Sequence, residues 1–257
     1  MVGGAGRMGR RLCRFFRARG HAVAVLDPAA APPGFARGSL QDAGTADVVV
    51  VAVSLARAAE AEEAVLDQRP RGLVLDIASV KAPLLPCIAR ARREGVRIAS
   101  VHPMFGPERS FRGRDLLICD TGDTAATARA RRLFSGAGLV MRALPVGEHD
   151  RWIARTLGLA HLVALVVASS LAESGIRAAD VAGAGSTSFR RLLSLLGPIL
   201  EQEPELTRAI QSANPESPAA AALLASELED WRGALFGDDG LARFQRKLAA
   251  ARAALAR

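Results

Sequence analysis

Lysines and aromatic residues are scarce in this 257-residue sequence, and tyrosine is absent. Lys81 and Lys247 are the only lysines, so the formal net charge of +8 comes almost wholly from scattered arginines. Nucleic-acid-binding surfaces commonly combine basic clusters with aromatic rings on which the bases stack. We therefore expect no nucleic-acid partner, because the positive charge better suits an anionic small substrate or cofactor.

Cysteine is also rare. Cys13, Cys87 and Cys119 are odd in number and lack the spacing of a disulfide framework or a metal site, so we expect reduced thiols, no bound metal and a cytoplasmic location. No apolar run follows the first residues as it would in a secretory signal peptide. The uncharged stretch 156–172 is short for a membrane span and contains His161, so we expect a buried helix and no membrane partner.

The two halves of the sequence differ in pattern, which predicts an α/β fold with a Rossmann-type doubly wound sheet over residues 1–145 and an all-α domain over 146–257. Strands are expected at 22–26, 48–53, 73–75, 98–101, 116–118 and 139–142. Helices are expected at 150–174, 186–201, 205–213, 218–235 and 239–255. The apolar stripes of the second half are too extensive for a lone small bundle, so we expect a homodimer through this domain.

A glycine-rich segment near the start predicts a dinucleotide site. Gly4, Gly6 and Gly9 form a GxGxxG pattern around Arg7 and Met8, followed by a helix predicted at 10–19 and a strand ending at Asp27. Such glycines let the backbone approach a pyrophosphate at a helix N-terminus. A carboxylate about 20 residues further on accepts hydrogen bonds from the adenosine ribose and repels a 2′-phosphate, so NAD is favoured over NADP.

The first strand is expected to be shortened. Only Met1 and Val2 precede the glycines, whereas a strand in this position usually has about five residues. Either the start site is misassigned or the sheet tolerates a stub, and in the second case we expect lower cofactor affinity or stability.

The segment 101–107 (VHPMFGP) places His102 between a strand expected to end at Val101 and two prolines. Proline fixes φ and lacks an N–H for a strand ladder, so His102 is expected on a restrained loop. From this segment alone, two interpretations stay open: a proton acceptor, or a histidine that only caps a turn.

Four segments in order carry a family resemblance: GGAGRMG at 3–9, DIASVK at 76–81, VHPMFGP at 101–107 and EHD at 148–150. Together they resemble the prephenate dehydrogenase family, most closely the dehydrogenase half of the bifunctional chorismate mutase/prephenate dehydrogenases. The resemblance implies NAD-dependent oxidative decarboxylation of a small anionic cyclohexadiene, prephenate, to 4-hydroxyphenylpyruvate in tyrosine or specialised aromatic biosynthesis.

The resemblance also implies roles for single residues. His102 would accept the substrate's hydroxyl proton, Ser79 would orient its imidazole, and Lys81 would help to hold the anionic substrate. The alternative, which we rank below the functional interpretation, is that Ser79 is a helix cap and Lys81 a solvated charge. His149 and Asp150 would contribute to the substrate pocket, although alone they would pass for a helix cap.

The chain departs from the family pattern at one position. The family has an arginine that binds the ring carboxylate just after the residue matched by Gly197, whereas this chain has Pro198, which is expected to break the helix locally. Prephenate binding should weaken unless Arg190 or Arg191 substitutes, since a charge-assisted contact contributes about 1.5–3 kcal/mol.

This departure keeps other functions open. Arogenate and 4-amino-4-deoxyprephenate are alternative substrates. A hypothesis of another class is a catalytically impaired NAD-binding dimer that acts as a partner protein.

Overall fold

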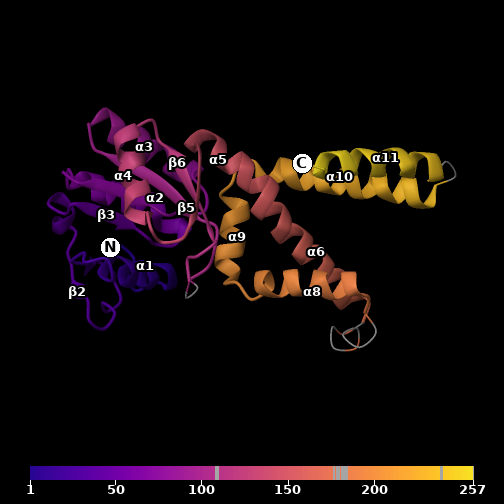
Figure 1. Ribbon diagram of the computed structural model, residues 1–257, viewed down its shortest axis with the longest axis horizontal. Helices are drawn as coiled ribbons and strands as arrows, with labels where there is room; N and C mark the ends of the chain where they lie inside the picture. Colours follow the sequence, from indigo (N-terminus) through magenta and orange to yellow (C-terminus); the bar gives the residue numbers. More distant parts are fainter. Residues whose placement is uncertain (108–109, 176, 178–179, 181–184, 238–239, 257) are drawn as a thin grey trace. The chain divides into compact units, whose positions relative to one another are not determined.

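The computed structural model describes residues 1–107, 110–175, 177, 180, 185–237 and 240–256. The chain forms two compact units (Figure 1). The first unit comprises residues 1–153 and 202–215, and the second comprises 154–201 and 216–257. These units divide the chain differently from the predicted domains 1–145 and 146–257, because the segments 146–153 and 202–215 cluster with the sheet.

The first unit is built on a mostly parallel sheet. Its strands are β1 (Ala24–Val25), β2 (Ala36–Arg37), β3 (Val48–Val51), β4 (Leu73–Asp76), β5 (Ile98–Pro103), β6 (Asp115–Asp120) and β7 (Val140–Pro145). The order β3-β4-β5-β6-β7 is hydrogen-bonded throughout, and β1 pairs with β2. Neighbouring strands are parallel except β5 and β6, which are antiparallel, with His102 opposite Leu117. The expected α/β class is confirmed, with this antiparallel pair and the short β2 as features that we did not predict.

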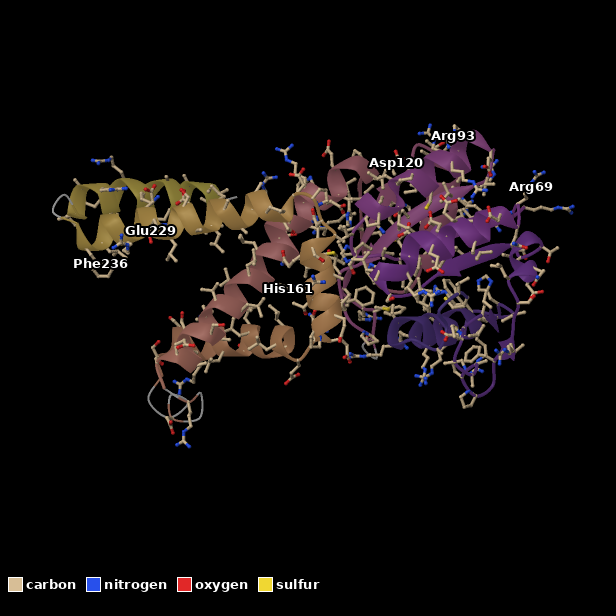
Figure 2. All side chains as sticks on the ribbon, turned by 180° about the vertical axis from the view of Figure 1, so that it is seen from behind. Arg69, Arg93, Asp120, His161, Glu229 and Phe236 are labelled. Carbon is tan, nitrogen blue, oxygen red and sulfur yellow. The ribbon has the colours of Figure 1, made fainter. Side chains whose placement is uncertain are left out.

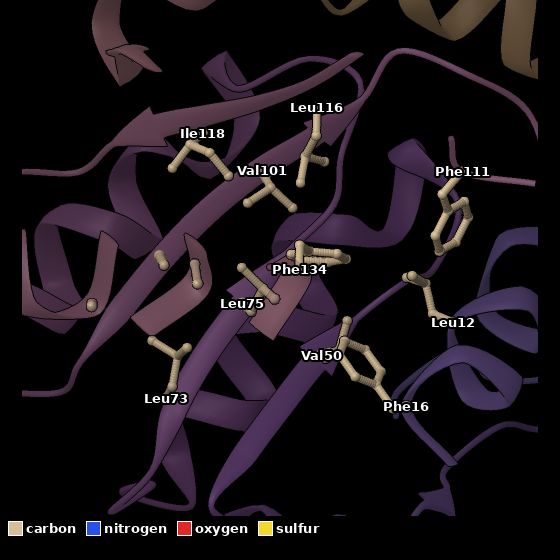
Figure 3. Close-up of a cluster of buried hydrophobic side chains, with 13 residues drawn as sticks. Leu12, Phe16, Val50, Leu73, Leu75, Val101, Phe111, Leu116, Ile118 and Phe134 are labelled. Atoms are coloured by element: carbon tan, nitrogen blue, oxygen red, sulfur yellow. The ribbon is translucent and has the colours of Figure 1, made fainter. Parts of the chain in front are cut away.

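Alternating strand residues face two buried clusters, one on each side of the sheet. On one side, Val50, Leu75 and Val101 pack against α1 (Arg7–Arg17) and α4 (Thr124–Phe134), as Figure 3 shows. On the other side, Val49 and Val74 pack against α2 (Leu55–Asp67) and α3 (Leu85–Arg93). The 3-10 turns η1 (Gln41–Gly44) and η2 (Ala82–Leu84) connect these elements. Burial on both faces is the reason that these strands read as continuous apolar runs.

The shortened first strand still occupies the centre of the sheet. Val2 forms parallel bridges with Leu26 and with Val51, so it joins β1 to β3. The strand order is therefore β2, β1, the Val2 stub, β3, β4, β5, as in dinucleotide-binding folds. The ammonium of Met1 donates to the carbonyl of Ala24, and a cavity of about 360 Å³ lies between the flanking strands on the side of Met1 away from the glycines.

Helices dominate the rest of the chain. They are α5 (Val146–Ile153), the π-helical turn η3 (Ala154–Gly158), α6 (Leu159–Glu173), α8 (Thr187–Leu200), α9 (Pro204–Ser212), α10 (Ser217–Phe236) and α11 (Gly240–Leu255). Every predicted helix has a counterpart, although residue 239, the expected start of the last one, lies outside the described residues. α8 continues through Pro198 to Leu200. The expected local break is therefore wrong, because a proline this close to a helix end removes only one backbone bond.

The expected burial of residues 156–172 is not observed within the single chain. In α6 only His161 and Ala164 are buried, whereas Leu165 and Val166 are exposed. By length and composition alone, Val146–Glu173 is apolar enough to cross a membrane, and 17% of its most apolar window is buried. A helix that is apolar on all sides needs more cover than α8 and α10, which pack against it in the second unit, provide.

Candidate active site

The glycine loop has the geometry of a pyrophosphate cradle. Gly3 has φ +78°, and a Cβ on Gly9 would lie 2.1 Å from the carbonyl oxygen of Gly3, so neither position accepts a side chain. Gly6 differs, because a Cβ there would meet nothing closer than 3.4 Å. Gly6 is exposed and supplies no side-chain cap to α1, so the first N–H groups of this helix are left for an anion.

Asp27 lies beside this glycine loop, just after β1. Its Oδ2 accepts a hydrogen bond from the Ala5 N–H at 2.9 Å, and its Oδ1 accepts one from the Ala29 N–H at 2.9 Å. The carboxylate is half-buried. It is therefore held beside the loop in the position expected for binding the ribose hydroxyls of NAD.

His102 lies at the carboxyl end of β5, on the same edge of the sheet as the glycine loop and the end of β4. We expected it on a loop, but the antiparallel neighbour β6 extends the strand to Pro103. The imidazole is 3% exposed. Its Nδ1 lies 3.0 Å from Nε2 of His149, on α5. His149 Nδ1 in turn lies 2.7 Å from Oδ1 of Asp150.

The carboxylate of Asp150 anchors this chain of contacts. Oδ1 also accepts from the Lys81 N–H at 2.8 Å, and Oδ2 accepts from the Ala82 N–H at 2.6 Å. The side-chain amide of Asn214 donates to the Asp150 carbonyl at 2.8 Å. The loop after β4, the helix α5 and the segment after α9 thus meet at Asp150, all within the first unit.

Burial sets the charge states in this cluster. Burial, followed by the charges of His149 and Lys81, holds the pKa of His102 well below its ordinary value. Burial also lowers the pKa of His149, against the opposing hydrogen bond to Asp150. Burial alone would raise the pKa of Asp150, but its hydrogen bonds from His149, Lys81 and Ala82 outweigh it and lower that pKa. Near neutral pH the two imidazoles are neutral and the carboxylate is ionised.

Comparison with known proteins identifies the fold and the family. Residues 32–142 match the prephenate dehydrogenase nucleotide-binding domain, and residues 145–231 match the prephenate dehydrogenase dimerization domain. The 4-amino-4-deoxyprephenate dehydrogenase of Streptomyces pristinaespiralis is 30% identical over 235 residues, which are 86% of this chain and 78% of that protein. This chain belongs to the prephenate dehydrogenase family.

Two further comparisons, one of sequence and one of structure, are consistent with this assignment. The T-protein of Enterobacter agglomerans is 28% identical over 208 residues, and the match covers 80% of this chain but only 54% of that longer protein. The crystal structure of prephenate dehydrogenase from Aquifex aeolicus, in complex with hydroxyphenyl propionate and NAD+, has a TM-score of 0.74 at 18% identity. It covers 99% of this chain and 96% of that one, so the fold is shared over nearly the whole length.

Two residues expected to bind substrate have other partners. Lys81 is fully buried, and its Nζ donates to Oδ1 of Asp76 at 2.6 Å and to the Val101 carbonyl at 2.9 Å. The charge of Lys81 is therefore paired with the Asp76 carboxylate in this structure, and the expected contact of Lys81 with a substrate stays a prediction. His149 is likewise fully buried and contacts His102, and its expected place in the substrate pocket stays a prediction.

The remaining predicted residues are exposed or half-buried. Ser79 follows β4 and is half-buried, and its hydroxyl makes no hydrogen bond with the described residues, so it does not orient His102 here. Arg190 and Arg191 are exposed on α8, in the second unit. The family match of the nucleotide-binding domain begins after the glycine loop, so the loop's assignment rests on its geometry.

The EHD motif led us to expect Asp150 in the substrate pocket, but not its link through His149 to His102. The motif lies inside α5, not at a cap, and Asp150 is 7% exposed. An acidic residue beside a histidine was the available signal. Its connection to His102, 48 positions earlier, depends on the meeting of β5 and α5 and is not visible in the sequence.

Proposed function

We propose that this chain catalyses the NAD-dependent oxidative decarboxylation of prephenate or a close cyclohexadiene analogue. The observation that carries the proposal is the burial of His102 at the sheet edge that also bears the glycine loop and Asp27, and this burial holds the pKa of His102 well below its ordinary value. Family membership supports the same reaction class.

The residues of the cradle fit NAD. The open position above Gly6, the uncapped α1 N-terminus, and Arg7 and Met8 in its first turn would take the pyrophosphate, and Asp27 would take the ribose. When bound, NAD supplies the acceptor for the hydride that leaves the ring carbon bearing the hydroxyl. We propose that Ser79 lies beside the nicotinamide, since it follows a strand at this edge.

His102 accepts the hydroxyl proton as that carbon becomes a carbonyl. The ring carboxylate then departs as CO2, and its bonding electrons make the ring an aromatic phenolate. The imidazolium returns its proton to the phenolate oxygen, which leaves 4-hydroxyphenylpyruvate when prephenate is the substrate. A base with a lowered pKa stays neutral at physiological pH, as this sequence of steps requires.

The proposal leaves open which substituent the ring of the substrate carries. The relative from Streptomyces pristinaespiralis is named for 4-amino-4-deoxyprephenate, which carries an amino group where prephenate has its hydroxyl. Pro198 in place of the family arginine also favours a non-standard substrate. We propose that Arg190 or Arg191 supplies the cation for the ring carboxylate, and Arg190→Gln and Arg191→Gln should each be tested for a raised KM.

The second unit is proposed to form a homodimer. Its match is to a dimerization domain, and Leu228 on α10 is exposed. Phe236, at the end of the same helix, is exposed too (Figure 2). The three buried free thiols fit a reducing cytoplasm, where we place the reaction.

A turnover panel tests the reaction. Purified protein with NAD and prephenate, arogenate or 4-amino-4-deoxyprephenate should yield NADH and CO2 in equal amounts with at least one of the three. His102→Asn should lose about 10²- to 10⁴-fold of kcat while it still binds NAD. NAD binding without turnover on any of the three would favour the alternative, a catalytically impaired partner protein.

A further inference from the structure

We infer that Asp150 and His149 are positioning residues that hold His102 in one tautomer, with its proton on Nδ1 and a lone pair on Nε2. The inference rests on the proposed function for its catalytic meaning. Its structural content, the location of one proton, can be measured separately.

The argument begins with the donors around Asp150. Backbone N–H groups can only donate, and those of Lys81 and Ala82 engage both carboxylate oxygens at 2.8 and 2.6 Å. An ionised carboxylate can only accept. The contact of 2.7 Å between Oδ1 and His149 Nδ1 therefore requires the proton of His149 to be on Nδ1.

The second step passes this constraint to His102. A neutral imidazole with its proton on Nδ1 has a lone pair on Nε2. His149 Nε2 lies 3.0 Å from His102 Nδ1, so His102 must be the donor of this hydrogen bond. The neutral ring of His102 then has its lone pair on Nε2, the nitrogen that forms no hydrogen bond with the described residues.

This arrangement does for the base what an isolated histidine cannot. The contact fixes the ring rotation, and it removes the tautomer in which Nε2 carries a proton and cannot accept another. When Nε2 takes the hydroxyl proton, the new positive charge is linked through two hydrogen bonds to the Asp150 carboxylate. The side chain of Asn214 donates to the Asp150 carbonyl, and this hydrogen bond helps to fix the position of Asp150 relative to the loop after β4.

The proton position is tested by NMR of protein labelled with 15N-histidine and saturated with NAD. The chain has four histidines, and His102→Asn identifies the signals of His102. We expect a protonated Nδ1 and an unprotonated Nε2 at neutral pH. A protonated Nε2 in the wild-type protein would overturn the inference, whether or not the protein turns over any of the three dienes.

Kinetics with paired variants separate positioning from general structural support. His149→Phe keeps a ring but removes both nitrogens, and we expect kcat to fall about 100-fold with little change in KM. His149→Gln retains an acceptor for the His102 N–H and should recover at least tenfold of that loss. The exposed His21, replaced by Gln, is the control and should leave kcat unchanged.

Asp150→Asn completes the test, because one amide oxygen cannot serve all three donors. The double variant His149→Phe/Asp150→Asn should be no slower than the slower single variant, since both changes break the same chain of contacts. Additive losses, or an unchanged kcat in His149→Phe, would overturn the inference. If His149→Phe fails to fold, His149→Gln and the wild-type NMR spectrum decide.

Discussion

The two lysines of the chain lie in different units and in opposite surroundings. Lys81, in the first unit, is fully buried against Asp76 and the Val101 carbonyl. Lys247, on α11 in the second unit, pairs with Glu227 and Asp230 of α10, whose side chains are half exposed to water. The first unit thus brings charge into its interior and neutralises it there, whereas the second keeps its charge at the surface.

The apolar residues show the reverse contrast. The first unit buries its large aliphatic side chains in two clusters, one on each face of the sheet. In the second unit Leu228 is 62% exposed, Phe236 82% and Leu241 72%. The first unit thus buries most of its large apolar side chains within one chain. The second has apolar area left over, as expected of a unit completed by another copy.

The buried lysine gives the largest expected effect. Lys81→Met leaves Asp76 charged and unpaired in the interior, so we expect a loss of about 3–5 kcal/mol in the free energy of unfolding, measured by urea denaturation. Lys247→Met is the matched control, because its partners remain solvated, and its loss should be much smaller.

A double variant checks the cause. Lys81→Met/Asp76→Asn removes both charges. The asparagine keeps an oxygen that can accept the hydrogen bond which the Ala78 N–H donates to Asp76 in the wild type. The double variant should recover most of the lost stability. Equal losses for Lys81→Met and Lys247→Met would show that burial of the charge is not what separates the two units.

The exposed apolar face of the second unit gives the next largest effect. Leu228→Ser/Leu235→Ser removes two exposed leucines spaced seven residues apart on one side of α10. If each is buried on dimerisation, about 1.5–3 kcal/mol is lost per side chain, and the dimer dissociation constant rises at least 100-fold. Sedimentation velocity measures this change. Leu206→Ser, an exposed leucine of the first unit, should leave the constant unchanged.

The regular parts of the fold could be predicted because their signals are local. Apolar runs located the parallel strands, and helical periodicity located the helices to within a few residues. The antiparallel pairing of β5 with β6 could not be predicted, because the relative direction of two strands depends on the path of the loop that connects them. The two-residue β2 has no apolar run to reveal it.

For the site, the sequence supplied residue types but not their partners. His102, Lys81 and His149 were named, yet the pairing of Lys81 with Asp76 and of His149 with His102 depends on contacts between separate elements. Glu62 was missed among neighbouring acidic residues, although it falls on the same helical stripe as Ala58 and Leu66, which are buried. That spacing was the available signal for a buried carboxyl group.

Glu62 offers a test of the first unit through pH. Its carboxyl oxygens are buried and have no partner among the described residues, and burial, with the nearby charge of Asp76, raises its pKa well above the ordinary value. A raised carboxyl pKa favours the folded state at pH below the unfolded pKa near 4.3, and this advantage is lost as pH rises toward the folded pKa. The unfolding free energy should therefore fall by up to about 1.4 kcal/mol per pH unit above pH 5, relative to Glu62→Gln.

Urea unfolding of both proteins between pH 5 and pH 8 measures this difference. Glu60→Gln, on the exposed side of the same helix, serves as the comparison and should parallel the wild type. A constant difference between the wild type and Glu62→Gln across this range would contradict a raised pKa.

The smallest expected effect concerns the cofactor cradle, where the first unit holds a charge ready for a ligand. Asp27→Asn keeps an oxygen for the Ala5 N–H but loses the negative charge, so we expect about 1 kcal/mol weaker NAD binding, a fivefold rise in Kd by calorimetry. The same change removes the repulsion between Asp27 and a 2′-phosphate, so the affinity for NADP should rise. Because the affinity for NAD falls at the same time, the ratio of the two affinities should decrease. Asp47→Asn, an exposed aspartate of the same unit, should move neither constant. Weaker binding of both cofactors would instead mean that Asp27 only supports the glycine loop, because a structural defect cannot favour the extra phosphate.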